Sequence, residues 1–278
     1  MRRREFLAAT VSPAAASIAS PMLPTTQADR WPADGFGAVA RFGVLTPDFD
    51  PVPESELWAM APRGVSIHTA RVGAKSGAAF VEAPAIDEAV DHLVRLRPRA
   101  ILLGYTSSSY ALGADADARV RARLEDRARG IRMIFPSLAA SAALGELGVQ
   151  RVSLVHPPWW TETANDQARA YWSAAGFEVV QCVRMQPLRD FTEVAPSEVV
   201  DFISARLPRE AQAVFIGGNG MRAVGAIKAL EARLRKPVIS ANQIVLYDAL
   251  RLVGQADRIA NYGSIFSGRK RTGASDRI

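Results

Sequence analysis

The sequence predicts an α/β protein made of two similar three-layer domains with mostly parallel sheets, related by a pseudo-two-fold axis and facing each other across a cleft. Two observations support this prediction. Along most of the 278 residues, short apolar runs typical of buried strands alternate with amphipathic helical segments. In addition, segments of the first half have counterparts in the second. Residues 100–109 and 213–223 each read as a strand followed by a polar loop of small residues, and the strand–serine–helix–glycine unit at 131–148 resembles 237–254.

The first half is expected to span residues 41–150. Its clearest helix is 85–96, where apolar residues recur on one helical face, and its clearest buried strand is 100–104. We predict strands at 40–45, 65–72, 100–104 and 131–135, and helices at 54–61, 85–96, 117–129 and 138–147. Asp117 and Ser137 are suitable N-cap residues for the last two helices.

The second half is expected to span 151–265, and it contains the stretch around which the chain is organised, 213–243. This stretch consists of a strand, the Gly-rich turn 217–220, a helix, a second strand and the polar loop 240–243. We further predict strands at 151–155 and 177–183, and helices at 163–175, 197–207 and 243–252. Because ligands of parallel sheets bind beyond the carboxyl ends of the strands, both polar segments are candidate parts of a site.

Charge and composition exclude several functions. The formal charge is +6, but residues 1–28 carry +2 and the end of a basic tail at 266–278 carries +3, which leaves +1 for the folded body. A nucleic-acid-binding domain needs a basic face, so we predict no nucleic-acid partner. Cys182 is the only cysteine, and the three histidines lack metal-ligand spacing, so we predict neither a disulfide nor a metal site. We expect Cys182 to be a buried small hydrophobe rather than a nucleophile.

Residues 1–28 resemble a twin-arginine signal peptide, and 29–40 would then be a linker. Arg3-Arg4 is followed by Phe6-Leu7 and a mild Ala/Ser-rich run that ends near Ala28. The alternatives are an arginine-rich tail without export function and a start codon assigned too far upstream. Export would make the protein periplasmic, and an unused signal would leave it cytoplasmic. Elsewhere the sequence has no run of the roughly 18 apolar residues that a membrane span needs, so we expect no span after signal removal.

Several short motifs occur in order between residues 41 and 265. The first half contains Gly43-Val44-Leu45-Thr46-Pro47, Glu54-x-Glu56, Pro62-x-Gly64-Val65-Ser66-Ile67-His68-x-x-Arg71 and Thr106-Ser107-x-Ser109. The second half contains Arg222, Glu231 and Lys236-Pro237-Val238-Ile239-Ser240-x-Asn242-Gln243. Together these motifs resemble the aspartate/glutamate racemase superfamily, in particular its arylmalonate decarboxylase and maleate cis-trans isomerase branch.

The resemblance implies an enzyme with its active site between two α/β domains and with neither a metal nor an organic cofactor. In that family, racemases and maleate isomerases use one cysteine from each half, whereas arylmalonate decarboxylases keep only the second. This sequence differs, because Tyr105 stands at the first cysteine position and Gly218 at the second. Pro157-Pro158-Trp159-Trp160 also stands where the family usually has a tyrosine.

Three residues are candidate catalytic residues. Thr106 and Ser107, just past a strand end, could hold a carboxylate or an enolate oxyanion, although such hydroxyls also cap helices. Tyr105 could act as an acid or a base, or could only fill the space of a missing cysteine.

The candidate substrate-binding residues lie at strand ends in both halves. Backbone N–H groups of the Gly-rich turn could bind an anion, or the turn could simply require positive φ angles. Trp159 could wall an aromatic pocket or could only pack. The full set of substrate-binding candidates is Pro47, Asp50, Ser109, Gly218, Asn219, Arg222, Asn242 and Trp159.

Two functions fit these residues. The first is a cofactor-independent decarboxylase or isomerase that acts on a small dicarboxylate or a 2-substituted malonate through an enediolate-like intermediate. The second is a non-catalytic exported protein that binds an organic acid in the same cleft. Both have a small carboxylate as partner, and both are compatible with a homo-oligomer.

Replacing Arg3 and Arg4 by lysine is expected to block export, because the paired arginines define this type of signal. The variant should stay in the cytoplasm with residues 1–28 still attached, as measured by cell fractionation and mass spectrometry of the intact chain. An unchanged periplasmic yield would contradict the export signal.

Overall fold

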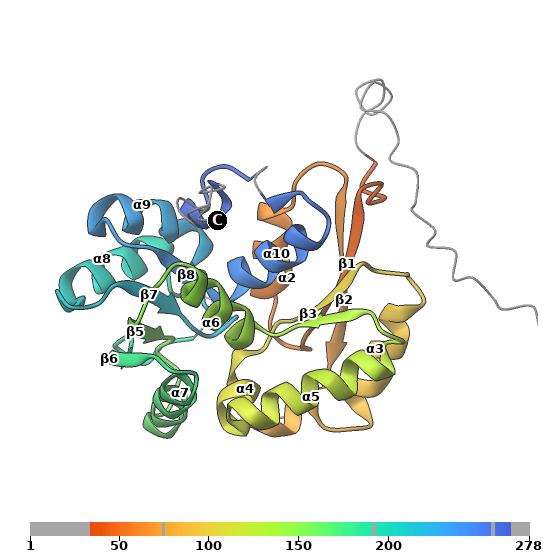
Figure 1. Ribbon diagram of the computed structural model, residues 1–278, viewed down its shortest axis with the longest axis horizontal. Helices are drawn as coiled ribbons and strands as arrows, with labels where there is room; N and C mark the ends of the chain where they lie inside the picture. Colours follow the sequence, from red (N-terminus) through yellow and green to blue (C-terminus); the bar gives the residue numbers. More distant parts are fainter. Residues whose placement is uncertain (1–33, 74–75, 191–192, 257–258, 268–278) are drawn as a thin grey trace, which may run out of the picture. The chain divides into compact units, whose positions relative to one another are not determined.

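The computed structural model describes residues 34–73, 76–190, 193–256 and 259–267. The predicted signal peptide and residues 268–278 of the predicted basic tail lie outside this part of the chain. Within it, two four-stranded sheets are formed, with the strand orders β2-β1-β3-β4 and β6-β5-β7-β8. All strand pairs are parallel, so the predicted α/β class with two similar halves is confirmed (Figure 1).

The first half contains strands β1 (Ala40–Pro47), β2 (Val65–Val72), β3 (Ala100–Leu103) and β4 (Arg132–Ile134). Its helices are α2 (Val52–Met60), α3 (Ala85–Val94), α4 (Thr106–Leu112), α5 (Ala114–Arg127) and α6 (Pro136–Glu146), with a short 3-10 helix η1 (Gly77–Val81). The second half contains strands β5 (Arg151–His156), β6 (Glu178–Arg184), β7 (Ala213–Ile216) and β8 (Val238–Ser240). Its helices are α7 (Glu162–Ala174), α8 (Pro196–Arg206), α9 (Val224–Leu234) and α10 (Ala241–Leu252), followed by the 3-10 helix η3 (Ser264–Ser267).

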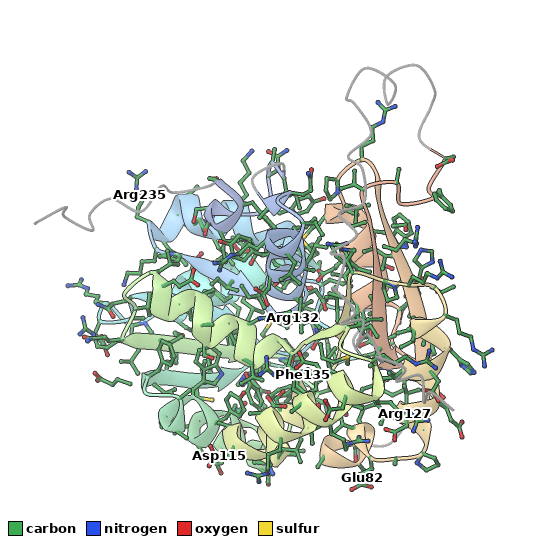
Figure 2. The ribbon with its side chains drawn as sticks, turned by 45° about the vertical axis from the view of Figure 1, so that its right-hand side comes forward. Glu82, Asp115, Arg127, Arg132, Phe135 and Arg235 are labelled. Carbon is green, nitrogen blue, oxygen red and sulfur yellow. The ribbon has the colours of Figure 1, made fainter. Side chains whose placement is uncertain are left out.

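Several helix starts differ from the prediction. The N-cap of α5 is Gly113, whose φ of 79° suits a glycine, so Asp117 lies inside the helix. The N-cap of α6 is Phe135 (Figure 2), because Pro136 is favoured at the first helical position, so Ser137 lies inside that helix. The segment 240–243 is not a loop but the start of α10.

Ser240 explains this early start of α10. Its hydroxyl accepts a hydrogen bond from the Gln243 N–H at 3.4 Å, and the Gln243 side chain accepts one from the Ser240 N–H at 3.1 Å. The two residues thus form a capping box. Asn242 is thereby fixed in the first turn of a helix.

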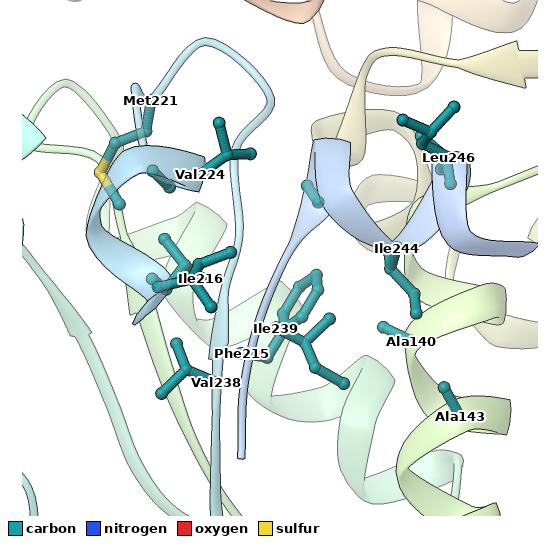
Figure 3. Packing of buried hydrophobic residues seen from close by; sticks show 14 of the residues in the cluster. Ala140, Ala143, Phe215, Ile216, Met221, Val224, Val238, Ile239, Ile244 and Leu246 are labelled. Carbon is teal, nitrogen blue, oxygen red and sulfur yellow. The ribbon is translucent and has the colours of Figure 1, made fainter. Parts of the chain in front are cut away.

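The last helix of each half packs against the other half. Helix α10 contacts α2, β3 and β4 of the first half (Figure 1). Conversely, α6 contacts α10 of the second half, and Ala140 and Ala143 of α6 belong to the same apolar cluster as Phe215 of β7 and Ile239 of β8 (Figure 3). One apolar core therefore includes residues of both sheets, and it fixes the carboxyl ends of β3 and β7 relative to each other.

Candidate functional site

The segments that follow β3 and β7 meet where Thr106 contacts Asn219. The Thr106 backbone N–H donates to the Asn219 Oδ1 at 2.8 Å, and the Thr106 hydroxyl donates to the same oxygen at 2.5 Å. Both residues are buried. The N–H is available because Thr106 is the first residue of α4, where backbone donors lack partners within the helix. Two donors that converge on one buried oxygen form the arrangement that holds a carboxylate or an oxyanion.

The hydrogen bonds continue from Asn219 to a buried carboxyl group in the first half. The Asn219 Nδ2 donates to the Asn242 Oδ1 at 2.7 Å, and the Asn242 Nδ2 donates to the Glu56 Oε2 at 2.8 Å. The Asn242 Nδ2 also donates to the Asn219 backbone oxygen at 2.8 Å. We call Thr106, Asn219, Asn242 and Glu56 the amide network.

Glu56 ends the amide network and is held by the start of α9. Its Oε1 accepts a hydrogen bond from the Val224 N–H at 2.9 Å. Burial raises the pKa of Glu56 to about 7, although the hydrogen bonds from Asn242 and from the α9 backbone act in the opposite direction. In the sequence, Glu56 is recognisable only as part of the family motif Glu54-x-Glu56, and it is not among the predicted site residues.

Asp50 lies next to the same Gly-rich turn. A Cβ atom on Gly220 would be 2.8 Å from the Asp50 Oδ2, so only glycine fits there without displacing the carboxyl group. The Asp50 Oδ1 accepts a hydrogen bond from the Val52 N–H at 3.0 Å. Burial raises the pKa of Asp50, while the Val52 N–H and the Arg71 guanidinium lower it. Two buried carboxyl groups, from Asp50 and Glu56, therefore face the segment that joins β7 to α9.

Tyr105 points away from the amide network, towards η1. Its ring packs on Phe80 with a centroid distance of 4.5 Å, and its hydroxyl oxygen accepts a hydrogen bond from the Gly77 N–H at 3.4 Å. The extended backbone of Tyr105, with a φ of −152°, directs the chain into α4. Its catalytic role stays a prediction.

The other predicted site residues surround these groups at different depths. Ser107 is half-buried in the first turn of α4, and Ser109 is buried beside Asp117. Pro47 is buried at the end of β1, whereas Arg222 is exposed before α9 and Trp159 is half-buried against the core.

Pro157 and His156 fill the space beneath the Gly-rich turn. Gly218 has a φ of +82°, and a Cβ atom there would lie 2.4 Å from the Pro157 Cγ. A Cβ atom on Gly217 would lie 2.7 Å from the His156 Cδ2. Burial lowers the pKa of His156 to about 4, so its ring is neutral near pH 7 and is held by Asn165, which lies 2.8 Å from its Nδ1. The position where the family carries its second thiol is therefore closed to a side chain.

Cys182 lies on β6, where it is half-buried rather than buried as predicted, and His156 stands between it and the Gly-rich turn, with 3.9 Å between the Cys182 sulfur and the His156 Nδ1. Its sulfur donates to the Asn165 backbone oxygen at 3.3 Å. Burial raises the pKa of the thiol to about 11, which keeps it protonated near pH 7. Within the described residues, no group of three His, Cys, Asp or Glu side chains could hold a metal ion, and no helix is long and apolar enough to cross a membrane.

Two halves that each contain a parallel four-stranded sheet form a known fold. The crystal structure of the maleate isomerase from Pseudomonas putida S16 superimposes with a TM-score of 0.74 at 20% identity, covering 82% of this chain and 98% of that chain. A mutant of the Nocardia farcinica maleate cis-trans isomerase, with a covalently bound succinylcysteine intermediate, gives a TM-score of 0.72 at 20% identity, covering 82% and 98%.

The chain belongs to the arylmalonate decarboxylase family, whose model matches residues 70–266. The arylmalonate decarboxylase of Bordetella bronchiseptica is 25% identical over 189 residues, which cover 65% of this chain and 78% of that protein. The resemblance predicted from the short motifs is therefore confirmed.

The contribution of Glu56 to the stability of the folded protein should fall as the pH rises through the titration of this group. The pKa of Glu56 is about 7 in the folded state and 4.5 without the fold, so the folded state binds the proton more tightly. The Glu56 contribution to the free energy of unfolding is therefore largest below pH 4.5 and falls as the pH rises to about 7. Between pH 5 and 7.5 we expect wild type to lose about 2–3 kcal/mol of unfolding free energy relative to Glu56→Gln, measured by urea unfolding of both proteins. The comparison removes the contribution of His156, whose lowered pKa changes stability with pH in the opposite sense in both proteins. Glu54→Gln, on the same helix, should behave like wild type, and an equal fall in Glu56→Gln would contradict this assignment.

A cysteine at position 218 should destabilise the protein, because it combines a left-handed backbone with a clash against Pro157. We expect Gly218→Cys to cost about 1–3 kcal/mol in thermal unfolding. Adding Pro157→Gly removes the ring and should recover part of this loss, which a double-mutant cycle measures. Gly145→Cys is the matched control, because a Cβ atom on Gly145 meets nothing within 4 Å. If Gly218→Cys were as stable as Gly145→Cys, Pro157 would not close the position.

Proposed function

We propose that this protein is a cofactor-independent enzyme that decarboxylates or isomerises a small dicarboxylate or a 2-substituted malonate without a thiol. One observation carries the proposal: the N–H and the hydroxyl of Thr106 converge on the Asn219 Oδ1. A substrate carboxylate oxygen that replaces the Asn219 Oδ1 would receive the same two hydrogen bonds. Family membership supports the reaction class.

Decarboxylation fits these donors. As the bond between the α-carbon and one carboxylate breaks, carbon dioxide leaves and the electron pair moves into the remaining carboxylate, giving an enediolate. The Thr106 donors would then hold an oxygen on which negative charge grows, which lowers the barrier more than it strengthens substrate binding. The α-carbon must finally accept a proton.

Asp50 is our proposed proton donor. Its carboxyl group is buried against Gly220, in the same turn as Asn219, and burial raises its pKa towards neutrality. The alternative donor is Tyr105, whose hydroxyl group would first have to leave the Gly77 N–H. Because the proton would reach the α-carbon from one side only, any new stereocentre would form with a single configuration.

A second candidate function is non-catalytic binding of an organic acid. It is favoured by the closed position at Gly218, where a Cβ atom would lie 2.4 Å from the Pro157 Cγ. The Nocardia farcinica relative carries its intermediate on a cysteine, whereas this chain has its single cysteine on β6. A protein of this kind would keep the carboxylate donors and lack turnover.

The deciding experiment is turnover of phenylmalonate and maleate, followed by NMR, together with calorimetric titration of both compounds. Thr106→Ala should weaken carboxylate binding by roughly 2- to 30-fold, because it removes a charged hydrogen bond of about 1.5–3 kcal/mol from the complex and a neutral one of about 1 kcal/mol from the free protein, and Thr106→Ser should keep the affinity of wild type. If Asp50 gives the proton, Asp50→Asn should slow turnover by about 10²–10⁴-fold while Tyr105→Phe stays active. Binding without turnover in wild type would reject the enzyme and leave the binding protein. Equal affinities of wild type and Thr106→Ala would remove Thr106 from the site.

A further inference from the structure

A cavity of about 440 Å³ lies outside the amide network, between α5, β4, α6 and α10. Its α10 wall consists of Tyr247, Asp248, Arg251 and Leu252, whereas Asn242 of the amide network lies at the opposite end of that helix. The volume falls within the range of about 300–1,000 Å³ that is usual for small-molecule sites. None of the four amide-network residues lines the cavity.

The charged lining of this cavity has one excess positive charge. Three arginines and two acids line it, and two of the arginines are paired: Arg251 with Glu146 at 3.0 Å and Arg132 with Asp248 at 3.7 Å. The third, Arg121 of α5, has its Nε–H buried without a hydrogen-bond partner among the described residues. Arg121 also interacts electrostatically with Asp117, one turn earlier on α5. Its unpartnered Nε–H still favours an acceptor from a ligand, and a carboxylate is the strongest such acceptor.

The remaining lining is apolar. Phe135, which is labelled in Figure 2, links β4 to α6 and contributes to the apolar lining together with Leu138, Ala139 and Tyr247, among others. The cavity lining therefore combines charged and apolar side chains, which suits an amphipathic molecule with a single negative charge.

We propose that this cavity is a second ligand site, which binds a small monocarboxylate with an aromatic or branched apolar body. Arg121 binds the carboxylate, and the apolar body packs on Phe135 and Leu138. The ligand contacts α5, α6 and α10, so it stabilises the packing of α6 against α10. The site does not depend on the function proposed above for the amide network.

The test uses the full-length protein and titrates 3-(4-fluorophenyl)propanoate, observed by fluorine NMR. Arg121→Gln should weaken binding by about tenfold or more, since it removes a charged donor. Ala142→Trp should abolish binding, because Ala142 lines the cavity and a tryptophan there fills it. Arg119→Gln, an exposed arginine on the same helix, is the matched control and should bind like wild type.

Two further measurements can overturn the proposal. The uncharged 3-(4-fluorophenyl)propanamide should bind at least tenfold more weakly, and equal binding would show that no cation holds the carboxylate. Thr106→Ala should leave propanoate affinity unchanged, and a loss there would place the probe at the amide network instead. Absence of binding to wild type at millimolar concentration, or full affinity in Ala142→Trp, would also reject the site.

Discussion

The hydrogen bonds that join Thr106 to Glu56 through two asparagine side chains are the constraint on which the site depends. A buried carboxyl group is costly unless its oxygens accept hydrogen bonds, and Glu56 accepts them from Asn242 and from the Val224 N–H. Each amide in between uses its oxygen as acceptor on one side and its nitrogen as donor on the other. Removing one member would leave a neighbour buried without a partner, so the network acts as one unit.

Helices α6 and α10, each of which packs against the other half, make the amide network possible. Glu56 lies on α2 of the first half, and Asn242 lies in the first turn of α10 of the second half. They meet because α10 packs against α2, while α6 packs its alanines on the second sheet. The apolar core that includes both sheets therefore determines where the polar groups meet, and the polar groups in turn satisfy each other without water.

The sequence predicts the strands well, because most of them contain short apolar or alternating runs, but it does not indicate contacts between distant residues. Helix α4 (Thr106–Leu112) is not among the predicted helices, because its residues have poor helix propensities, and burial of Ser108, Ser109 and Tyr110 supports it. The hydrogen bond between Glu56 and Asn242 joins residues 186 positions apart in the sequence, and no local pattern indicates it. The closure of Gly218 by Pro157 likewise depends on two loops that meet only in the folded chain.

The surroundings of Thr106 and Gly218 differ, and this difference affects how strongly a ligand can bind. The thiol position is filled by Pro157, whereas the Thr106 donors remain and are occupied by an internal acceptor, the Asn219 oxygen. A ligand carboxylate must therefore displace a neutral amide oxygen that is already well placed. Charged acceptors form hydrogen bonds roughly twice as strong as neutral ones, so the exchange is favourable, but by the difference between two bonds rather than by a whole one. Displaced Asn219 must also find new partners for its side chain, or Asn242 and Glu56 lose theirs. Carboxylate binding at Thr106 is therefore coupled to rearrangement of the whole amide network, and the pKa of Glu56 should change when a ligand binds.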